Sequence, residues 1–198
     1  MEWDWRHFLL LVHLLSTLMM AAPFYMLVIV NERGRFGAPL GYFTDRYMEN
    51  IIRNNAVRCF IFQGTMAASG LGLIHVASWR SWSDLATEPA MVIKWVALLT
   101  MVSLLSYIHF NLQPRVEALI NQLKPDEAAP AEIGPQLRGL RLRRKRFSGV
   151  CLFLVLTALI MGLKATFFYD PYVAGIFVAV AALYAWRAYR KPVPLGWI

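Results

Sequence analysis

Five ionisable side chains lie inside long apolar stretches of this sequence. They are His13, His75, Lys94, His109 and Lys164. A charge in such a stretch costs several kcal/mol unless it is paired or used, so each of these residues is a candidate for binding or catalysis. A neutral histidine can ligate a metal or move a proton, and a lysine can pair with an anion. The chemistry to expect is therefore cofactor binding within an apolar environment.

His13 and His75 are the candidate metal ligands. His13 lies about five residues from one end of the first apolar run, and His75 about four residues from the matching end of the second, so at 1.5 Å per residue both lie roughly 6–8 Å below the same surface. Two neutral imidazoles at one depth on neighbouring helices are what the axial ligation of haem b requires. We expect His13 and His75 to hold a haem iron.

A strip of small residues shares the helix face of His75. Gly64, Ala68 and Gly72 are spaced by four, and at 100° per residue His75 falls on the same face. Such a strip lets a neighbouring helix or a flat macrocycle approach closely, so Gly72 is a candidate contact to the cofactor. Two alternatives stay open. The strip and the histidines can serve helix packing and interhelical hydrogen bonds alone, or they can bind a quinone or another small molecule.

The two lysines and the third histidine carry weaker signals. Lys94 and Lys164 lie within a few residues of helix ends, where their ammonium groups can reach the headgroups of the bilayer. Beside a haem, either lysine can instead pair with a propionate, so Lys94 and Lys164 are both candidate cofactor contacts. His109 lies near the opposite end of its helix and is predicted to form an interfacial or interhelical hydrogen bond.

Five apolar runs must position these residues. A bilayer core of roughly 30 Å needs about 20 apolar residues in a helix. Four runs reach that length and a fifth is shorter: 8–30, 57–79, 89–112, 147–168 and 172–186. The composition, with 58% hydrophobic and 14% aromatic residues, agrees with a protein whose helices lie in lipid. We predict an all-α integral membrane protein, a bundle of four to five transmembrane helices.

The distribution of basic residues predicts the orientation of the bundle. With five spans, 16 of the 20 Lys and Arg residues fall on one side of the membrane. The positive-inside rule makes that side cytoplasmic, which puts the N-terminus outside and the C-terminus in the cytoplasm of a bacterial inner membrane. The net charge of +8 then reflects topology and contacts with membrane lipids, and nucleic acid is not an expected partner.

The segments between the runs suggest how the chain is organised. Residues 1–168 are expected to form a four-helix bundle with a cytosolic linker near 124–140, and residues 169–198 to add the shorter fifth helix and a cytosolic tail. A short interfacial helix is expected within 37–56, and the basic run 141–146 is expected to contact lipid. The two cysteines, Cys59 and Cys151, have no metal-type spacing.

Several motifs, taken in order along the chain, resemble one known family. They are His13 followed by AAPFYMLVIV, Tyr47-Met48-Glu49 before a span with GLGLI, Lys94-Trp95 opening the third span, and GLKATF closing the fourth. Over about residues 8–168 this order resembles the HemJ-type protoporphyrinogen oxidases and their CopD-like relatives. The resemblance implies that the protein carries haem b, that His13 and Lys94 are the functional pair, and that Lys164 matches the lysine of the family's last helix.

Three functions follow from these patterns. The first is a haem-b-binding protein that transfers electrons, as a subunit or partner of a respiratory-type membrane complex, with His13 and His75 as axial ligands. The second, implied by the resemblance, is an enzyme that oxidises protoporphyrinogen IX to protoporphyrin IX and passes electrons to quinone, with His13 and Lys94 central. The third is a cofactor-free accessory or CopD-like transport protein. The Met and Cys residues are dispersed and do not form clusters with metal-ligand spacing, which counts against a copper-binding site.

Overall fold

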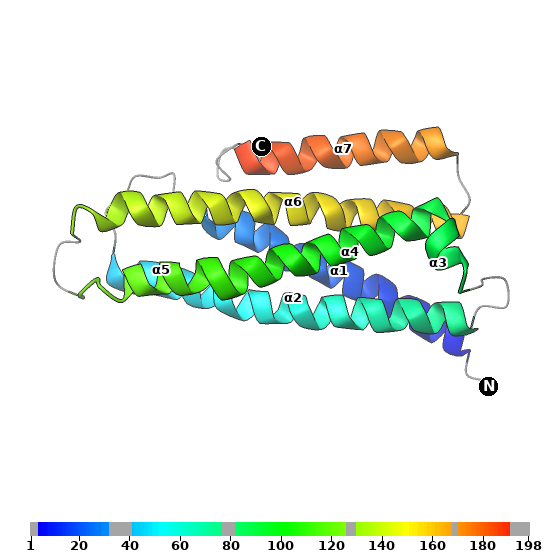
Figure 1. Ribbon diagram of the computed structural model, residues 1–198, viewed down its shortest axis with the longest axis horizontal. Helices are drawn as coiled ribbons and strands as arrows, with labels where there is room; N and C mark the ends of the chain where they lie inside the picture. The colour runs from blue at the N-terminus through cyan, green and yellow to red at the C-terminus, as the bar shows by residue number, and fades with distance from the viewer. Residues whose placement is uncertain (1–3, 32–40, 77–81, 126–129, 168–169, 191–198) are drawn as a thin grey trace.

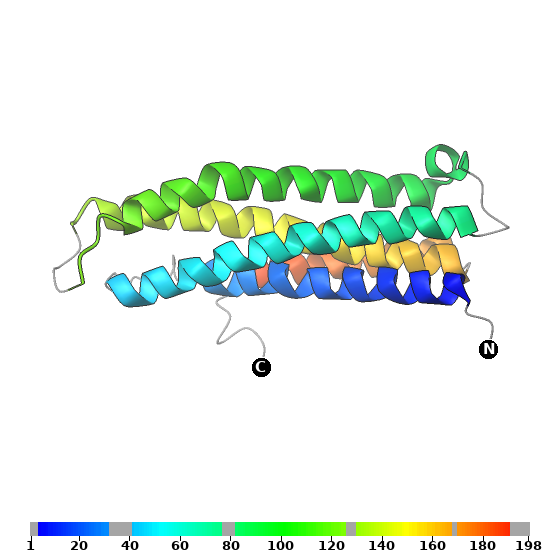
Figure 2. The ribbon, with the colours of Figure 1, turned by 90° about the horizontal axis from the view of Figure 1, so that it is seen from below.

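The computed structural model describes residues 4–31, 41–76, 82–125, 130–167 and 170–190, and every regular element within these ranges is a helix. Successive long helices run in opposite directions and lie side by side as a bundle (Figure 1, Figure 2). The elements are α1 (Trp5–Asn31), α2 (Tyr42–Val76), the short α3 (Asp84–Thr87), α4 (Pro89–Tyr107), the π-helical turn η2 (Ile108–Leu112), α5 (Gln113–Ile120), α6 (Ile133–Phe167) and α7 (Pro171–Arg190).

The helices have the length and composition of membrane spans. In the described ranges, five helical stretches are long and apolar enough to cross a bilayer, and the one formed by α7 has 20 residues. The predicted all-helical bundle is confirmed, including its fifth apolar helix. Large apolar side chains cover its outer surface, among them Leu99 and Leu183, which are 61% and 63% exposed. A soluble protein would bury such a surface, whereas lipid solvates it.

Acidic caps and prolines fix where two of the helices begin. The Glu88 carboxylate accepts a hydrogen bond from the backbone N–H of Met91 at 2.9 Å, and Pro89 occupies the first turn of α4. Asp170 accepts from the backbone N–H of Tyr172 at 2.7 Å, directly before α7. Both carboxylates satisfy N–H groups that have no partner within the helix, and proline is tolerated there because its missing N–H is not needed.

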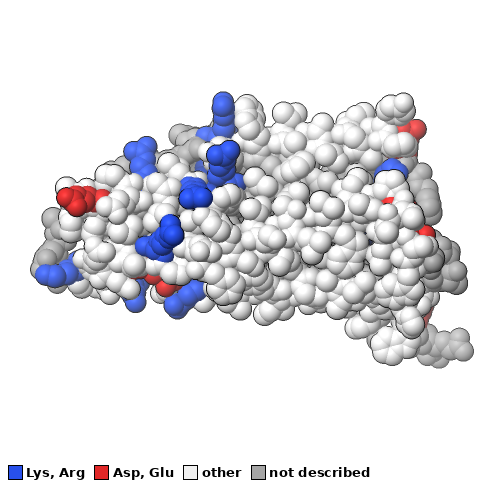
Figure 3. All heavy atoms as spheres, viewed as in Figure 1, with Lys and Arg blue, Asp and Glu red and all other residues white. Residues whose placement is uncertain are grey.

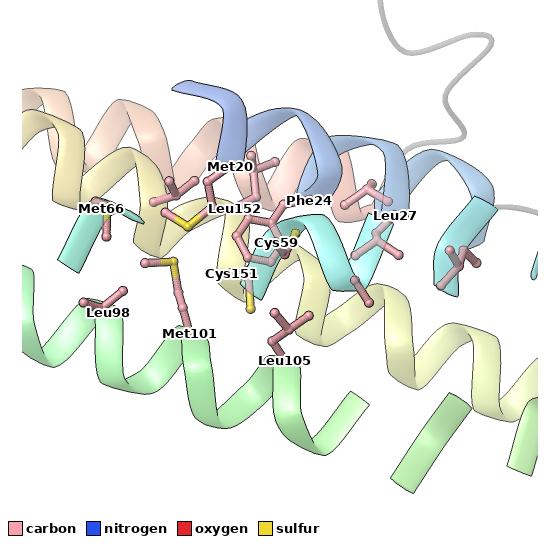
Figure 4. Packing of buried hydrophobic residues seen from close by; sticks show 14 of the residues in the cluster. Met20, Phe24, Leu27, Cys59, Met66, Leu98, Met101, Leu105, Cys151 and Leu152 are labelled. Carbon is pink, nitrogen blue, oxygen red and sulfur yellow. The ribbon is translucent and has the colours of Figure 1, made fainter. Parts of the chain in front are cut away.

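The core lies where α1, α2, α4 and α6 meet. Figure 4 shows Met20 and Phe24 of α1 facing Cys59, Met101 and Cys151 of the other three helices. All five side chains are fully buried. The two cysteines are free thiols within this apolar cluster. They serve as small packing residues, which agrees with the lack of any metal-type spacing in the sequence.

Helices α2 and α6 are longer than a bilayer requires. Each has 35 residues, which at 1.5 Å per residue gives about 50 Å against a hydrocarbon core of roughly 30 Å. The polar first half of α2 extends the same helix that crosses the membrane. The expectation of a separate interfacial helix within 37–56 is therefore wrong for residues 42–56. Buried Asp45 and Glu49 explain this, because they tie that half of α2 to α6.

The predicted linker near 124–140 is also corrected in part. Helix α6 begins at Ile133, so residues 133–140 are helical, whereas residues 126–129 lie outside the described ranges. Ile133 and Leu137 are buried, and Leu137 packs against Val116 and Ile120 of α5. These apolar contacts hold the first turns of α6 in a fixed place, which a flexible linker would not have.

A π-helical turn joins α4 to α5. The backbone N–H of Gln113 donates to the carbonyl of Ile108, five residues earlier, which widens the helix by one residue. Pro114 follows immediately and supplies the reason. A proline has no N–H to donate to the carbonyl four residues before it and its ring clashes with that carbonyl, so the helix must open there. Such turns often lie at functional sites.

Candidate functional site

His13 of α1 is held by α2. Its Nδ1 lies 3.0 Å from the carbonyl oxygen of Met66 and 3.1 Å from the hydroxyl of Ser69. A carbonyl can only accept a hydrogen bond, so Nδ1 must carry the hydrogen, and in the neutral ring Nε2 keeps its lone pair. The same arrangement orients metal-ligating histidines, whose second nitrogen usually donates to a carbonyl or carboxylate.

Lys94 brings α4 and α6 to the same region. The positive charge of Lys94 is close enough to act on His13 electrostatically. Its Nζ lies 3.9 Å from where a Cβ on Gly162 of α6 would be, and Lys94 is half-buried. Gly70 of α2 completes the set, because His13 Cε1 lies 3.1 Å from the position of a Cβ there. Four helices therefore contribute to one site around His13 and Lys94.

His75 does not join this site. It is exposed near the end of α2, nine residues after Met66, and nine residues at 100° each put it on nearly the opposite face of the helix. Gly64 and Ala68 of the small strip lie on that outward face too, since both are exposed. The structure thus separates the two histidines that the sequence pattern had paired as haem ligands.

Gly72 and Lys164 occupy positions at the edge of the site. A Cβ on Gly72 would lie 3.3 Å from Leu9 of α1, so this glycine allows close packing of α1 on α2. Lys164 is half-buried on α6, two residues beyond Gly162, and therefore about 200° around the helix from the face that meets Lys94. Neither position supports a contact with a cofactor held by His13.

A buried ionic network at the other end of the bundle has no counterpart in the sequence-based expectations. The guanidinium groups of Arg141 and Arg144 on α6 donate to Glu49 of α2, and Arg141 also donates to Asp45 at 2.6 Å. Arg144 donates further to Asn31 of α1 and to Gln113 of α5, each at 2.7 Å. The network therefore joins four helical elements.

Three of the six residues in the basic run 141–146 thus point into the protein. Arg141, Arg144 and Lys145 are buried, while Arg143 and Arg146 are exposed. The prediction that this run forms a lipid-contacting face holds at most for its exposed members. The missed signal was the spacing: Asp45 and Glu49 are four apart and Arg141 and Arg144 three apart, so each pair shares one helix face.

The fold and these sites define a class: a multi-pass helical protein with five candidate membrane spans. Comparison of the chain with protein family models, with curated proteins and with solved structures found no significant match. Within the described residues, no three His, Cys, Asp or Glu side chains come together as a metal site. A haem iron requires only one or two axial ligands, and His13 is a suitable one.

Proposed function

We propose that this protein binds haem b through Nε2 of His13 in a bacterial cytoplasmic membrane, and that it acts as an oxidoreductase on a porphyrin with Lys94 as the second functional residue. The observation that carries the proposal is the hydrogen bond between His13 Nδ1 and the Met66 carbonyl. It fixes the ring and the tautomer in the way that a metal ligand needs, and it leaves Nε2 available.

The fit of a porphyrin to this site is supported by charge as well as by the ligand. Haem and its porphyrinogen precursor both carry propionate groups, and the ammonium of Lys94 can pair with one of them. Such a pair is strong in a low-dielectric environment. Bound haem would supply a one-electron redox centre. His13 would hold this group, and Lys94 would orient a propionate of the cofactor or of the substrate.

The exposed position of His75 favours one of the two redox functions. A bis-histidine electron carrier needs a second imidazole opposite His13, and His75 lies on the far face of α2. The HemJ-like alternative needs only His13 and Lys94, which lie within electrostatic reach of each other. We therefore favour oxidation of protoporphyrinogen IX to protoporphyrin IX. In that reaction the substrate loses six hydrogens as six protons and six electrons, which together reduce three quinone molecules to quinols.

We also infer the orientation in the membrane. Lys and Arg side chains gather toward the end of the molecule formed by α5, the start of α6 and the end of α7, while the other half is almost free of charge on the face shown in Figure 3. Cytoplasmic ends of membrane proteins are rich in Lys and Arg. The His13 and Lys94 site then lies toward the outer side, and the buried ionic network toward the cytoplasm.

The difference between the dithionite-reduced and oxidised absorbance spectra of the purified protein tests the proposal. Wild type, His75→Ala and the matched control His7→Ala should show the α-band of haem b, and His13→Ala should lose it. His7 is a suitable control because it pairs with exposed Asp4 at 2.5 Å at the surface. Lys94→Met should keep haem but oxidise protoporphyrinogen at least about tenfold more slowly, because the variant loses one charge-assisted hydrogen bond to the substrate.

Two outcomes would contradict the proposal. Loss of the α-band in His75→Ala would instead support the electron carrier in which His13 and His75 both ligate the haem iron. A wild-type protein without haem, when produced in cells that make haem in excess, would leave the cofactor-free accessory function.

A further inference from the structure

We propose that Gln63 of α2 and His109 of η2 form a second site, which binds a lipid-soluble ring molecule of the quinone and quinol class. The two side chains come from different helices, on the cytoplasmic side of the His13 site in the orientation inferred above. Both place hydrogen-bonding atoms in an apolar interior. The binding site itself is independent of whether haem is bound at His13.

Gln63 carries the strongest signal. It is 2% exposed, and within the described part of the chain neither its Nε2 nor its Oε1 has a hydrogen-bond partner. A buried amide without partners costs about 1–3 kcal/mol, so native proteins nearly always satisfy it with protein, water or a ligand. Its neighbours on the buried stripe of α2, Cys59 and Met66, are apolar. The amide offers one group that donates and one that accepts.

His109 offers a second group of the same kind. Its Nδ1 is buried and, among the described residues, has no hydrogen-bond partner. The ring packs edge to face against two aromatic rings, with centroids 5.8 Å from Phe60 and 5.0 Å from Phe110, and these two rings are themselves 6.4 Å apart. The π-helical turn that Pro114 imposes sets the direction of this side chain.

The contact between Phe60 and His109 brings the two groups near each other. Phe60 and Gln63 are three residues apart on α2, and residues with this spacing are neighbours on one helix face, about 5–6 Å apart at Cβ. Phe60 touches the His109 ring. Phe60 therefore connects the two residues, because it is about one helical turn from Gln63 on α2 and touches His109 across the boundary between α2 and η2. A single ring with an oxygen on each side can span such a pair.

The surroundings select the chemical class of the ligand. Aromatic edges flank the site, fully buried Cys59 and Leu105 line the bundle beside it, and Phe110 on the same turn as His109 is 68% exposed on the surface of the bundle. A ligand that enters past Phe110 must be soluble in lipid, and one that binds between aromatic edges should be flat. Carbonyl or hydroxyl groups on that ring would pair with the amide and the imidazole. Quinones and quinols meet all three conditions.

The position suits a redox partner of the first site. Met66, whose carbonyl holds His13, is three residues from Gln63 and six residues from Phe60. Six residues correspond to about 9 Å along α2. If the proposed function is correct, a quinone here would accept a pair of electrons and a pair of protons from the porphyrinogen oxidation and leave as the quinol. Only this role, and not the binding, rests on the proposed function.

A direct binding measurement tests the site. Purified protein, freed of lipid-soluble ligands, is titrated with a short-chain benzoquinone, and an azido analogue of the same quinone is cross-linked by light and mapped by mass spectrometry. Wild type should bind, with cross-links within 57–66 or 106–113. Gln63→Leu and His109→Phe should each weaken binding about tenfold or more, and Thr100→Val should not. Thr100 is a fair control because it is exposed on α4 and bonds its own helix at 2.7 Å.

Stability measurements show whether misfolding of a variant, instead of loss of the site, causes weaker quinone binding. Both substitutions replace a side chain that has buried polar atoms without a hydrogen-bond partner, as far as the structure describes the chain, by an apolar one of similar size. The Tm of each variant should therefore equal or exceed that of wild type. Equal quinone affinity in all variants, or a fall in Tm for Gln63→Leu with binding unchanged, would overturn the proposal and indicate a structural water at Gln63.

His13→Ala separates the two proposals. This variant should lose haem and still bind quinone. Haem in the wild type with no specific quinone binding would overturn only the second site, and quinone binding without haem would overturn only the first.

Discussion

The His13 imidazole lies directly against the backbone of Gly70, with Cε1 only 3.1 Å from where a Cβ would stand. Any side chain at position 70 must displace the ring or move α1 away from α2. Either movement would lengthen the hydrogen bond from His13 Nδ1 to the Met66 carbonyl. Gly70 is therefore the position from which the geometry of His13 can be changed without changing His13 itself.

Gly70→Val is expected to destabilise the protein by about 1–3 kcal/mol, the usual cost of overpacking, and to lower the haem content of the purified protein. Gly64→Ala is the control on the same helix, since among the described residues no atom beyond its own turn of helix lies within 4 Å of a Cβ there. It should leave Tm unchanged or raise it slightly, because alanine favours a helix more than glycine does. Thermal unfolding in detergent and the haem-to-protein absorbance ratio provide the two readouts. Equal effects at both positions would argue against the contact.

The ionic network should make a large contribution to stability that depends on both partners. Arg144→Ala would leave Glu49 buried without its closest cation, the Nη1 to Oε2 distance being 2.7 Å. Breaking a buried pair in this way costs about 3–5 kcal/mol. Arg143→Ala removes an exposed cation that contacts the rings of Tyr107 and Phe147, and it should cost less than about 1 kcal/mol. Unfolding in mixed detergents would compare the two variants. Similar losses would show that the network does not hold the bundle together.

The two cysteine thiols should be protected from reagents in the folded protein. Cys59 and Cys151 are both fully buried in the central cluster. A membrane-permeant maleimide should therefore label neither of them until a denaturant opens the bundle, after which both should react. Mass spectrometry of intact protein counts the labels. Rapid labelling under native conditions would mean that the core formed by α1, α2, α4 and α6 opens readily.

The inferred orientation leads to a fusion experiment. Green fluorescent protein joined after residue 198 should fluoresce, because it folds in the cytoplasm, and alkaline phosphatase joined at the α2–α3 connection should be active, because it requires the outer side. Fusion of the phosphatase within the α5–α6 connection should be inactive. The reverse pattern would put the basic end outside and contradict the positive-inside rule for this protein.

The helices themselves were predictable because an apolar run of spanning length has few other uses. All five runs correspond to helices, including the short run at 172–186, which lies within α7. Helices α2 and α6 extend much further than their runs. Their polar first halves look like loop sequence on their own, and the ionic contacts of Asp45, Glu49, Arg141 and Arg144 help to make them part of the bundle.

The site was predictable only in part, for a related reason. An imidazole in an apolar run identifies His13, but the partners that hold it are a backbone carbonyl and the hydroxyl of Ser69, which no motif marks. The pairing with His75 assumed that equal depth means proximity. The relative rotation of α1 and α2 decides that question, and it depends on packing such as that of Gly72 on Leu9.

The buried pair of Glu49 and Arg144 links residues 95 positions apart in the chain. During synthesis, α1 and α2 leave the ribosome long before α6, so the two carboxylates of α2 have no guanidinium partners at that stage. The ionic network can therefore be completed only when the fourth long helix is present. Until then, Asp45 and Glu49 lack the guanidinium groups of Arg141 and Arg144 that neutralise them in the folded protein.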